Sequence, residues 1–474
     1  MDEQRRLIKN TGIIALGNMS TKLVSFFLLP LYTSILSTAE YGTVDYVISI
    51  STFCVPFISM LMDESMFRFL IDCKTEQEKN RVISTSMVII LIGGILFGVV
   101  AYPVLKIVRY QYAFFLIAYV ISSVVSAMMN ALLRGIGRTA QYAICNFLTS
   151  VLILILNVVF IAGLYWGVEG MLLSSIIAHV LVPLIYVFRL RLWKYFDRSA
   201  VNRPLAKEMI RYSIPLIPNK LSWSIINLSD RIIIMNVIGS DVAGLYAVSH
   251  KFPNLMDTVY GFFYQSWKES SARAIRDGNP DAFYNKIYQY LKDVMYAVVL
   301  VMTAFMPLAF HVLINDKFGS AILYVPILLL GTYFANISGF YGGIFTAYKD
   351  TRIMGTTTIA AAAINFIVNI VLIWKFGLWA AALSTLIANL VVYVYRKHRV
   401  KKYIRLEENT RKRILALIST VLVLTCFYSS LFTLKILGMI ISMVYAVLAN
   451  KNFIRIIIDH LKARIHGKRG RKDG

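Results

Sequence analysis

The sequence predicts an all-α membrane protein that crosses the bilayer about 14 times. Two observations carry this prediction: apolar stretches of about 20 residues follow one another along the chain, and basic residues gather in every second loop between them. The composition agrees, because 58% of the 474 residues are hydrophobic, only 16% are charged, and the mean hydropathy is +0.65. An apolar run of about 20 residues is long enough to cross a ~30 Å hydrocarbon core as a helix, whereas soluble chains carry more charge.

The predicted spans alternate between short turns on one side of the membrane and longer loops on the other. The first run is too long for a signal peptide and no small-residue cleavage motif follows it, so we expect it to stay in the membrane. The expected spans are 8–36, 41–62, 82–102, 112–133, 140–163, 167–188, 212–238, 242–266, 288–314, 320–347, 353–374, 377–395, 414–433 and 435–450.

The basic residues predict the orientation of these spans. Of the 49 Lys and Arg residues, 40 lie in one alternating set of loops and five in the other. Positive charge stays on the cytoplasmic side during insertion, so we expect both termini in the cytoplasm. This distribution also explains most of the formal net charge of +24, and it argues against binding of nucleic acid.

The two halves of the chain resemble each other. Residues 167–178 align with 377–388 at an offset of 210, and five of the twelve positions are identical. Chance similarity between apolar helices is the alternative, but two further matches occur in the same order at similar offsets. These matches are Thr139 and Asn157 with Thr351 and Asn369, and Leu36, Thr38 and Gly42 with Ile238, Ser240 and Gly244.

Each copy of the repeat contains six helices, which is an even number, so both copies enter the membrane in the same sense. This pattern is typical of transporters in which two parallel-repeat lobes flank the substrate site. We expect an N-lobe at 1–190, a C-lobe at 205–398, two extra spans within 413–452 and a basic cytoplasmic tail at 453–474.

The sequence indicates neither catalysis nor a metal site. No GxxxxGK[ST] motif for ATP is present, and the GxGxxA match at Gly135 lies in a turn between two spans rather than after a strand. The histidines form no nucleophile–base arrangement, and the four cysteines are too far apart for a disulfide framework or a metal site. We therefore expect a protein that is not an enzyme.

Ionisable residues within the spans are few, so each is expected to face protein or water rather than lipid. In 212–238, polar side chains recur at helical spacing and share one face; 8–36, 41–62 and 242–266 carry similar stripes. Matched polar faces in both halves predict a central hydrated cavity. The candidate cavity residues are Lys22, Asp45, Lys220, Asn227, Asp230, Arg231, His250, Lys251 and Asp257.

An alternative interpretation assigns these residues a structural role. Polar side chains also hold membrane helices together, and long basic side chains near helix ends extend to the interface. Asp230 points about 100° away from Arg231 on a helix, so we expect Asp230 to meet another helix. Arg231 could instead pair with Asp45, Asp230 or Asp257.

Three stretches carry a resemblance to a known family by their order and spacing. They resemble the polysaccharide flippase family of the multidrug/oligosaccharidyl-lipid/polysaccharide exporter superfamily, along nearly the whole chain. The stretches are Gly12, Gly17, Pro30 and Leu36 with 40–43 and 62–69; 133–142 with 167–170; and 211–218 with 227–231 and 243–246.

The resemblance implies alternating access across the bacterial cytoplasmic membrane. Members move a glycan on undecaprenyl diphosphate from the inner to the outer leaflet, for O-antigen, teichoic acid or capsule assembly. It implies a lipid-linked oligosaccharide and membrane lipids as partners, with a polymerase and glycosyltransferases in the pathway. No cofactor is implied; coupling to a proton or sodium gradient stays open.

Three other functions stay open. A cation-coupled multidrug exporter would need acidic residues to dominate the cavity, whereas basic residues here are at least equal to them. A flippase of the lipid-linked peptidoglycan precursor would belong to a sister branch. A scaffold of a polysaccharide assembly complex would not transport at all.

Overall fold

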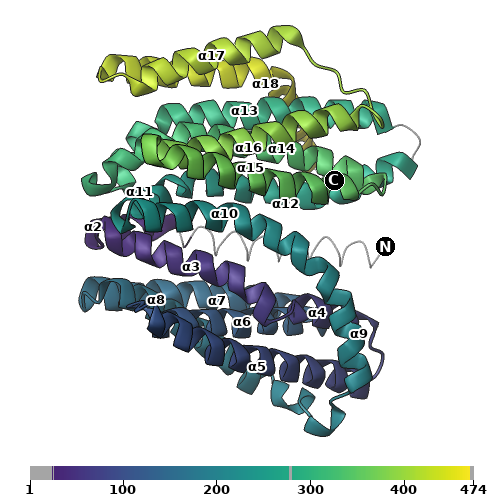
Figure 1. The fold of residues 1–474 in the computed structure, drawn as a ribbon. Helices are drawn as coiled ribbons and strands as arrows, with labels where there is room; N and C mark the ends of the chain where they lie inside the picture. Colours follow the sequence, from purple (N-terminus) through teal and green to yellow (C-terminus); the bar gives the residue numbers. More distant parts are fainter. Residues whose placement is uncertain (1–23, 25, 277–279, 470–474) are drawn as a thin grey trace. The chain divides into compact units, whose positions relative to one another are not determined.

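The computed structural model describes residues 24, 26–276 and 280–469 (Figure 1). These residues are mostly helical and include no β-strand, and ten of their helices are long and apolar enough to cross a membrane. The prediction of an all-α polytopic membrane protein is confirmed. Because the described part begins at residue 24, most of the expected span 8–36 and its Lys22 lie outside it.

The helices of the first compact unit come from residues 1–248, joined by the short stretch 369–378. Here α6 packs against α8, α7 against α8, and α3 against both α6 and α10 (Figure 1). The helices are α2 (Leu29–Ile35), α3 (Thr38–Ile58), α4 (Met62–Asp72), α5 (Glu76–Ile107), α6 (Ala113–Gly135), α7 (Thr139–Asn157), α8 (Gly167–Arg189), α9 (Arg203–Ser213), α10 (Ile217–Val237) and α11 (Ser240–Ser249).

The second unit comprises residues 249–368 and 379–474. Its closest helix pairs are α12 with α14, α13 with α18, and α17 with α18. The helices are α12 (Lys251–Arg276), α13 (Pro280–Leu313), α14 (Val325–Ala347), α15 (Arg352–Phe376), α16 (Leu378–Val400), α17 (Thr410–Tyr428) and α18 (Phe432–Arg469). The 3₁₀ segment Asp316–Tyr324 leads into α14, where the sequence predicted regular helix from residue 320.

Two helices of the first unit begin with reciprocal side-chain caps. Ser37 accepts a hydrogen bond from the Glu40 backbone N–H (3.2 Å) and donates its own backbone N–H to the Glu40 carboxylate (2.8 Å). Thr75 and Glu78 repeat this arrangement at the start of α5. Such capping boxes satisfy amide groups that a helix start leaves unpaired, so these two helix starts are encoded locally.

The surface of α5 shows the polarity expected of a membrane helix. Leu91, Ile95 and Val99 are 63%, 57% and 66% exposed, whereas Ser84 and Ser86 are buried. Large apolar side chains on the outside would be costly in water but suit a lipid environment.

Two expected single spans are interrupted. The span predicted at 41–62 ends as α3 at Ile58, and Met60 and Leu61 take left-handed backbone angles (φ 47° and 52°) before α4. The span predicted at 242–266 breaks at His250, between α11 and α12. Left-handed angles are costly for side chains other than glycine, so the first break is held by tertiary packing that no local sequence signal reports.

Candidate functional site

The predicted polar face of α10 is only partly available to bind anything. Lys220 is exposed at the start of the helix, whereas Ser224 is buried and donates its hydroxyl to the Lys220 backbone oxygen (3.3 Å). The side chain of Asn227 lies outside the described part of the structure. Pro218 in the first turn suits a helix start, since proline lacks the amide hydrogen that would be unpaired there.

An ion pair joins α10 to α3. The Arg231 Nε donates to the Asp45 carboxylate at 2.6 Å, and the two side chains are 13% and 18% exposed. Asp45, one of the three carboxylates considered as partners for Arg231, is therefore a partner in the structure. A charge-assisted bond at this depth is strong, and each charge would be costly to leave without its partner.

The neighbouring carboxylate has different partners. Asp230 is 3% exposed and accepts hydrogen bonds from the Tyr246 hydroxyl of α11 and the Asn369 side-chain amide of α15, both at 2.7 Å. This confirms that Asp230 meets other helices. Asn369 belongs to the short stretch of α15 that joins the first unit. Asp230 thus ties α10 to two other helices through two neutral donors.

The remaining candidates lie in the second unit. His250 occupies the break before α12, Lys251 is the first residue of α12 and partly exposed, and Asp257 is exposed further along the same helix. Tyr246, from the same predicted span 242–266, lies in α11 and is fully buried against Asp230. The break at His250 separates the two parts of that predicted stripe.

Sequence reasoning missed a buried arginine. Arg396 was assigned to a basic loop, but it lies within α16 and is 3% exposed. Its guanidinium donates to the Thr357 hydroxyl of α15 (2.8 and 2.9 Å) and to the Ser338 backbone oxygen of α14 (3.1 Å). The charge is thus held by hydroxyl and carbonyl oxygens. Because Arg396 opens a run of basic residues, its sequence context is that of a loop.

The carboxylate of Glu408, in the connection 401–409, joins several residues of the second unit. Glu408 pairs with Lys397 at 2.5 Å and accepts a hydrogen bond from the Tyr288 hydroxyl at 3.0 Å. Partial burial raises the pKa of Glu408, but the hydrogen bond and charge of Lys397 outweigh it and leave that pKa below its ordinary value. This loop is therefore tied to α13 and α16.

The described part of the chain holds no cluster of three or more histidine, cysteine or acidic residues suited to a metal ion. The arrangement around α10 is instead a set of charged and polar side chains inside an apolar helical unit. Within this set Arg231 is paired with Asp45, and Lys220 is exposed.

Solved structures with a similar fold are membrane transporters. A structure of the lipid II flippase MurJ in an inward closed conformation matches with a TM-score of 0.69 at 14% identity, over 94% of this chain and 99% of that chain. An inward-facing multidrug resistance transporter of the MATE family matches with a TM-score of 0.62 at 16% identity, over 80% of this chain and 98% of that chain. At these identities the likeness concerns the fold alone.

Sequence comparison gives a more specific relationship. The uncharacterized membrane protein MJ1375 of Methanocaldococcus jannaschii is 22% identical over 431 residues, which cover 84% of this chain and 99% of that protein. Residues 7–267, more than half of the chain, match the family described as polysaccharide biosynthesis protein. The resemblance found in the sequence is thereby confirmed, and the chain belongs to the polysaccharide biosynthesis protein family.

Proposed function

We propose that this protein moves an oligosaccharide linked to undecaprenyl diphosphate from the inner to the outer leaflet of a bacterial cytoplasmic membrane, for export of surface polysaccharide. The observation that supports this most is the family match, which spans residues 7–267 and includes α3 and α10 with their charged pair. A transporter fold without any metal cluster in its described residues agrees with a role in moving a substrate.

Polar side chains inside the first unit suit such a substrate. A diphosphate and its sugars cannot cross hydrocarbon unaided, because each unsatisfied polar group costs several kcal/mol there. In this proposal Arg231 binds the diphosphate when its contact with Asp45 opens, since guanidinium groups form strong paired bonds to phosphate. Lys220 is exposed at the start of the same helix and would supply a second positive charge.

The other predicted cavity residues keep supporting roles in the proposal. Lys22, His250 and Lys251 would add charge or hydrogen bonds around the glycan, and Asn227 would contact the sugars. Asp257 would limit the net positive charge of the cavity. Coupling to a proton or sodium gradient would drive the cycle, and a polymerase and glycosyltransferases would act before and after transport.

A second candidate is transport of the lipid-linked peptidoglycan precursor. It is favoured by the fold match to the lipid II flippase, which extends over 94% of this chain. The two substrates share a diphosphate on a polyprenyl chain, so Arg231 of α10, which pairs with Asp45 of α3, would serve either one. A cation-coupled drug exporter would need acidic residues to dominate these helices, whereas Arg231 offsets the charge of Asp45 there.

Deletion of the gene separates these functions. The proposal expects loss of surface polysaccharide with intact cell growth and accumulation of its lipid-linked precursor inside the cell. Cell lysis on depletion of the protein would instead indicate transport of the peptidoglycan precursor. Drug sensitivity with normal surface polysaccharide would indicate a drug exporter. Complementation with the unaltered chain is the control, and normal polysaccharide in the deletion strain would refute the proposal.

A further inference from the structure

A pocket of about 190 Å³ lies where the last two helices meet α13. Lys286, Gln289, Tyr290 and Asp293 of α13 form one wall, and Lys412 of α17 forms another. Ala449, Asn450, Asn452 and Phe453 of α18 complete it. The rings of Tyr290 and Phe453 are 5.5 Å apart and close one side. All of these lining residues belong to the second unit.

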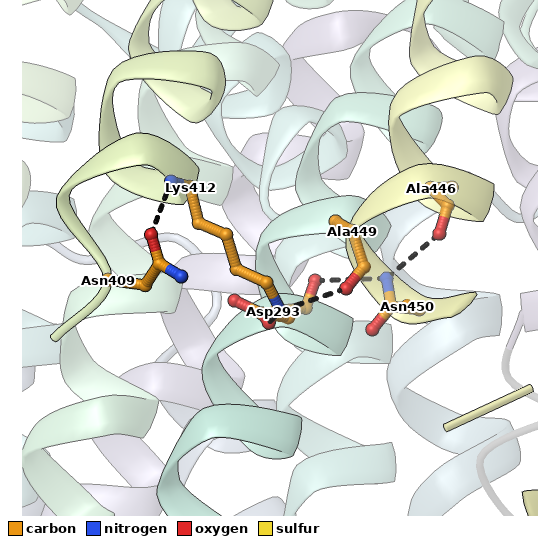
Figure 2. A network of polar contacts seen from close by, with 6 residues as sticks. All are labelled: Asp293, Asn409, Lys412, Ala446, Ala449 and Asn450. Carbon is orange, nitrogen blue, oxygen red and sulfur yellow. Dashed lines mark hydrogen bonds and ion pairs between the residues drawn. The ribbon is translucent and has the colours of Figure 1, made fainter. Parts of the chain in front are cut away.

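An ion pair and hydrogen bonds hold several residues of the pocket wall in place (Figure 2). Lys412 binds the Asp293 carboxylate at 2.5 Å and the Ala449 backbone oxygen at 3.2 Å. Asp293 is 6% exposed, so its charge is compensated by Lys412. The Asn450 amide donates to the Ala446 oxygen at 3.0 Å and to the Asp293 backbone oxygen at 3.4 Å. These contacts fix the positions of the lining groups before any ligand arrives.

The lining combines one uncompensated positive charge with neutral groups that form hydrogen bonds. With Asp293 compensated by Lys412, the ammonium group of the exposed Lys286 leaves the pocket with a net positive charge. Gln289, Tyr290 and Asn452 add an amide, a phenol and a second amide that can donate. A set of positive and neutral donors of this kind suits the several acceptor oxygens of a phosphate group.

One buried acceptor in the pocket wall further restricts the chemistry of the ligand. Asn450 is 8% exposed, and its side-chain oxygen receives no hydrogen bond in the described structure although both bonds of its amide nitrogen are made. A buried acceptor without a donor is costly. Asn450 lines the pocket, so a ligand hydroxyl beside the phosphate would satisfy this oxygen once the amide turns toward the cavity.

We propose that the pocket between α13, α17 and α18 binds a phosphate group that carries a hydroxyl donor. Two sources share this chemistry: the glycerol-phosphate headgroup of an anionic phospholipid, and inorganic phosphate. The proposed cytoplasmic location of the 401–409 loop puts the pocket at the inner leaflet surface, where anionic headgroups gather. The bound group would brace α17 and α18 against α13.

The test measures ligand binding to the purified full-length protein by native mass spectrometry. Phosphatidylglycerol, which has hydroxyl donors, is titrated against phosphatidylcholine, which has none, and thermal stability is measured with sodium phosphate against sodium chloride at equal ionic strength. Lys286→Gln removes one pocket charge without touching the Asp293–Lys412 contact. Lys451→Gln is the matched control, because Lys451 is exposed beside Asn450 and does not line the pocket.

The unaltered protein should bind phosphatidylglycerol more tightly than phosphatidylcholine. Lys286→Gln should weaken the binding of phosphatidylglycerol about fivefold, which is the effect expected for one lysine near a membrane surface. Lys451→Gln should leave it unchanged. Stabilisation by sodium phosphate that requires Lys286, without a lipid preference, would identify inorganic phosphate as the source. Equal binding by the two lysine variants, or no response to either ligand, would overturn the proposal.

Discussion

Gly42 of α3 and Gly244 of α11 each occupy a place where the other helix leaves no room for a side chain. A Cβ atom on Gly42 would overlap the Ser240 backbone oxygen, and one on Gly244 would overlap the Thr38 backbone oxygen. The contact is reciprocal, and it joins the two segments that match at an offset of 202 in the sequence. Such mutual contacts are what a two-fold relationship between similar segments produces.

Gly244→Ala should destabilise this crossing, because overpacking a close helix contact typically costs about 1–3 kcal/mol. Thermal unfolding of the purified protein, followed by loss of monodisperse material, measures the effect. The control is Gly94→Ala: no atom lies within 4 Å of a Cβ at Gly94, so this variant should match or exceed the unaltered protein. A Gly244→Ala protein as stable as that control would show that the helices can separate at little cost.

Arg231→Ala should lower the amount of protein in the membrane, because it leaves the Asp45 carboxylate without its partner at 2.6 Å. Breaking such a buried pair costs up to about 3–5 kcal/mol. Asp45→Asn in the same chain should restore abundance, which immunoblotting of membranes measures. Normal abundance in Arg231→Ala alone would contradict a structural role for the pair.

Surface polysaccharide in the double variant then separates structure from function. If Arg231 also binds the diphosphate, Arg231→Ala with Asp45→Asn should accumulate normally but export little polysaccharide. Arg231→Lys should keep part of the activity, because the charge remains while the forked donor is lost. Normal export from the double variant would remove Arg231 from the proposed substrate site.

Arg396→Lys should destabilise the second unit, because a single ammonium cannot reproduce bonds from several guanidinium nitrogens to Thr357 and Ser338. Lost bonds of a charged donor typically cost about 1.5–3 kcal/mol, and unfolding measurements would detect the change. Arg399→Lys is the matched control, since Arg399 is an exposed residue of the same helix. Equal stability of the two variants would argue that Thr357 adapts to lysine.

Glu408 should make the stability of the protein depend on acid pH. Its pKa is lower in the folded chain than its ordinary value, so its contribution is complete above the unfolded pKa of about 4.3 and is lost as pH falls through the folded pKa. Glu408→Gln should reduce thermal stability at pH 7 and lose less on acidification than the unaltered protein. Parallel pH profiles of the two proteins would contradict this assignment.

The proposed orientation in the membrane can be tested by labelling single cysteines, introduced into a chain whose four native cysteines are replaced. Asp316 and Lys402 are both exposed, so reagent access depends on the side of the membrane. With 40 basic residues in one set of loops and five in the other, a cysteine at position 316 should react with an impermeant thiol reagent in intact cells, and one at 402 only after lysis. Labelling of a cysteine at position 402 in intact cells would show that the topology is the reverse of the proposed one.

Much of the helical framework could be read from the sequence. The spans predicted at 112–133 and 167–188 appear as α6 (Ala113–Gly135) and α8 (Gly167–Arg189). These spans are encoded locally, because a long apolar run can satisfy its backbone only as a helix in the membrane. The capping pair of Ser37 and Glu40 is equally local. The division into lobes at 1–190 and 205–398 stays a prediction.

Tertiary structure decided which polar residues meet. The sequence allowed Arg231 three carboxylate partners, and the packing of α10 on α3 places Asp45 against it. It also placed Arg396 in a loop, whereas packing against α14 and α15 buries it. Hydropathy along the chain reports how apolar a helix is, but not which neighbour covers each face. The partners of buried charges depend on contacts between distant residues, so they appear only once the helices are packed.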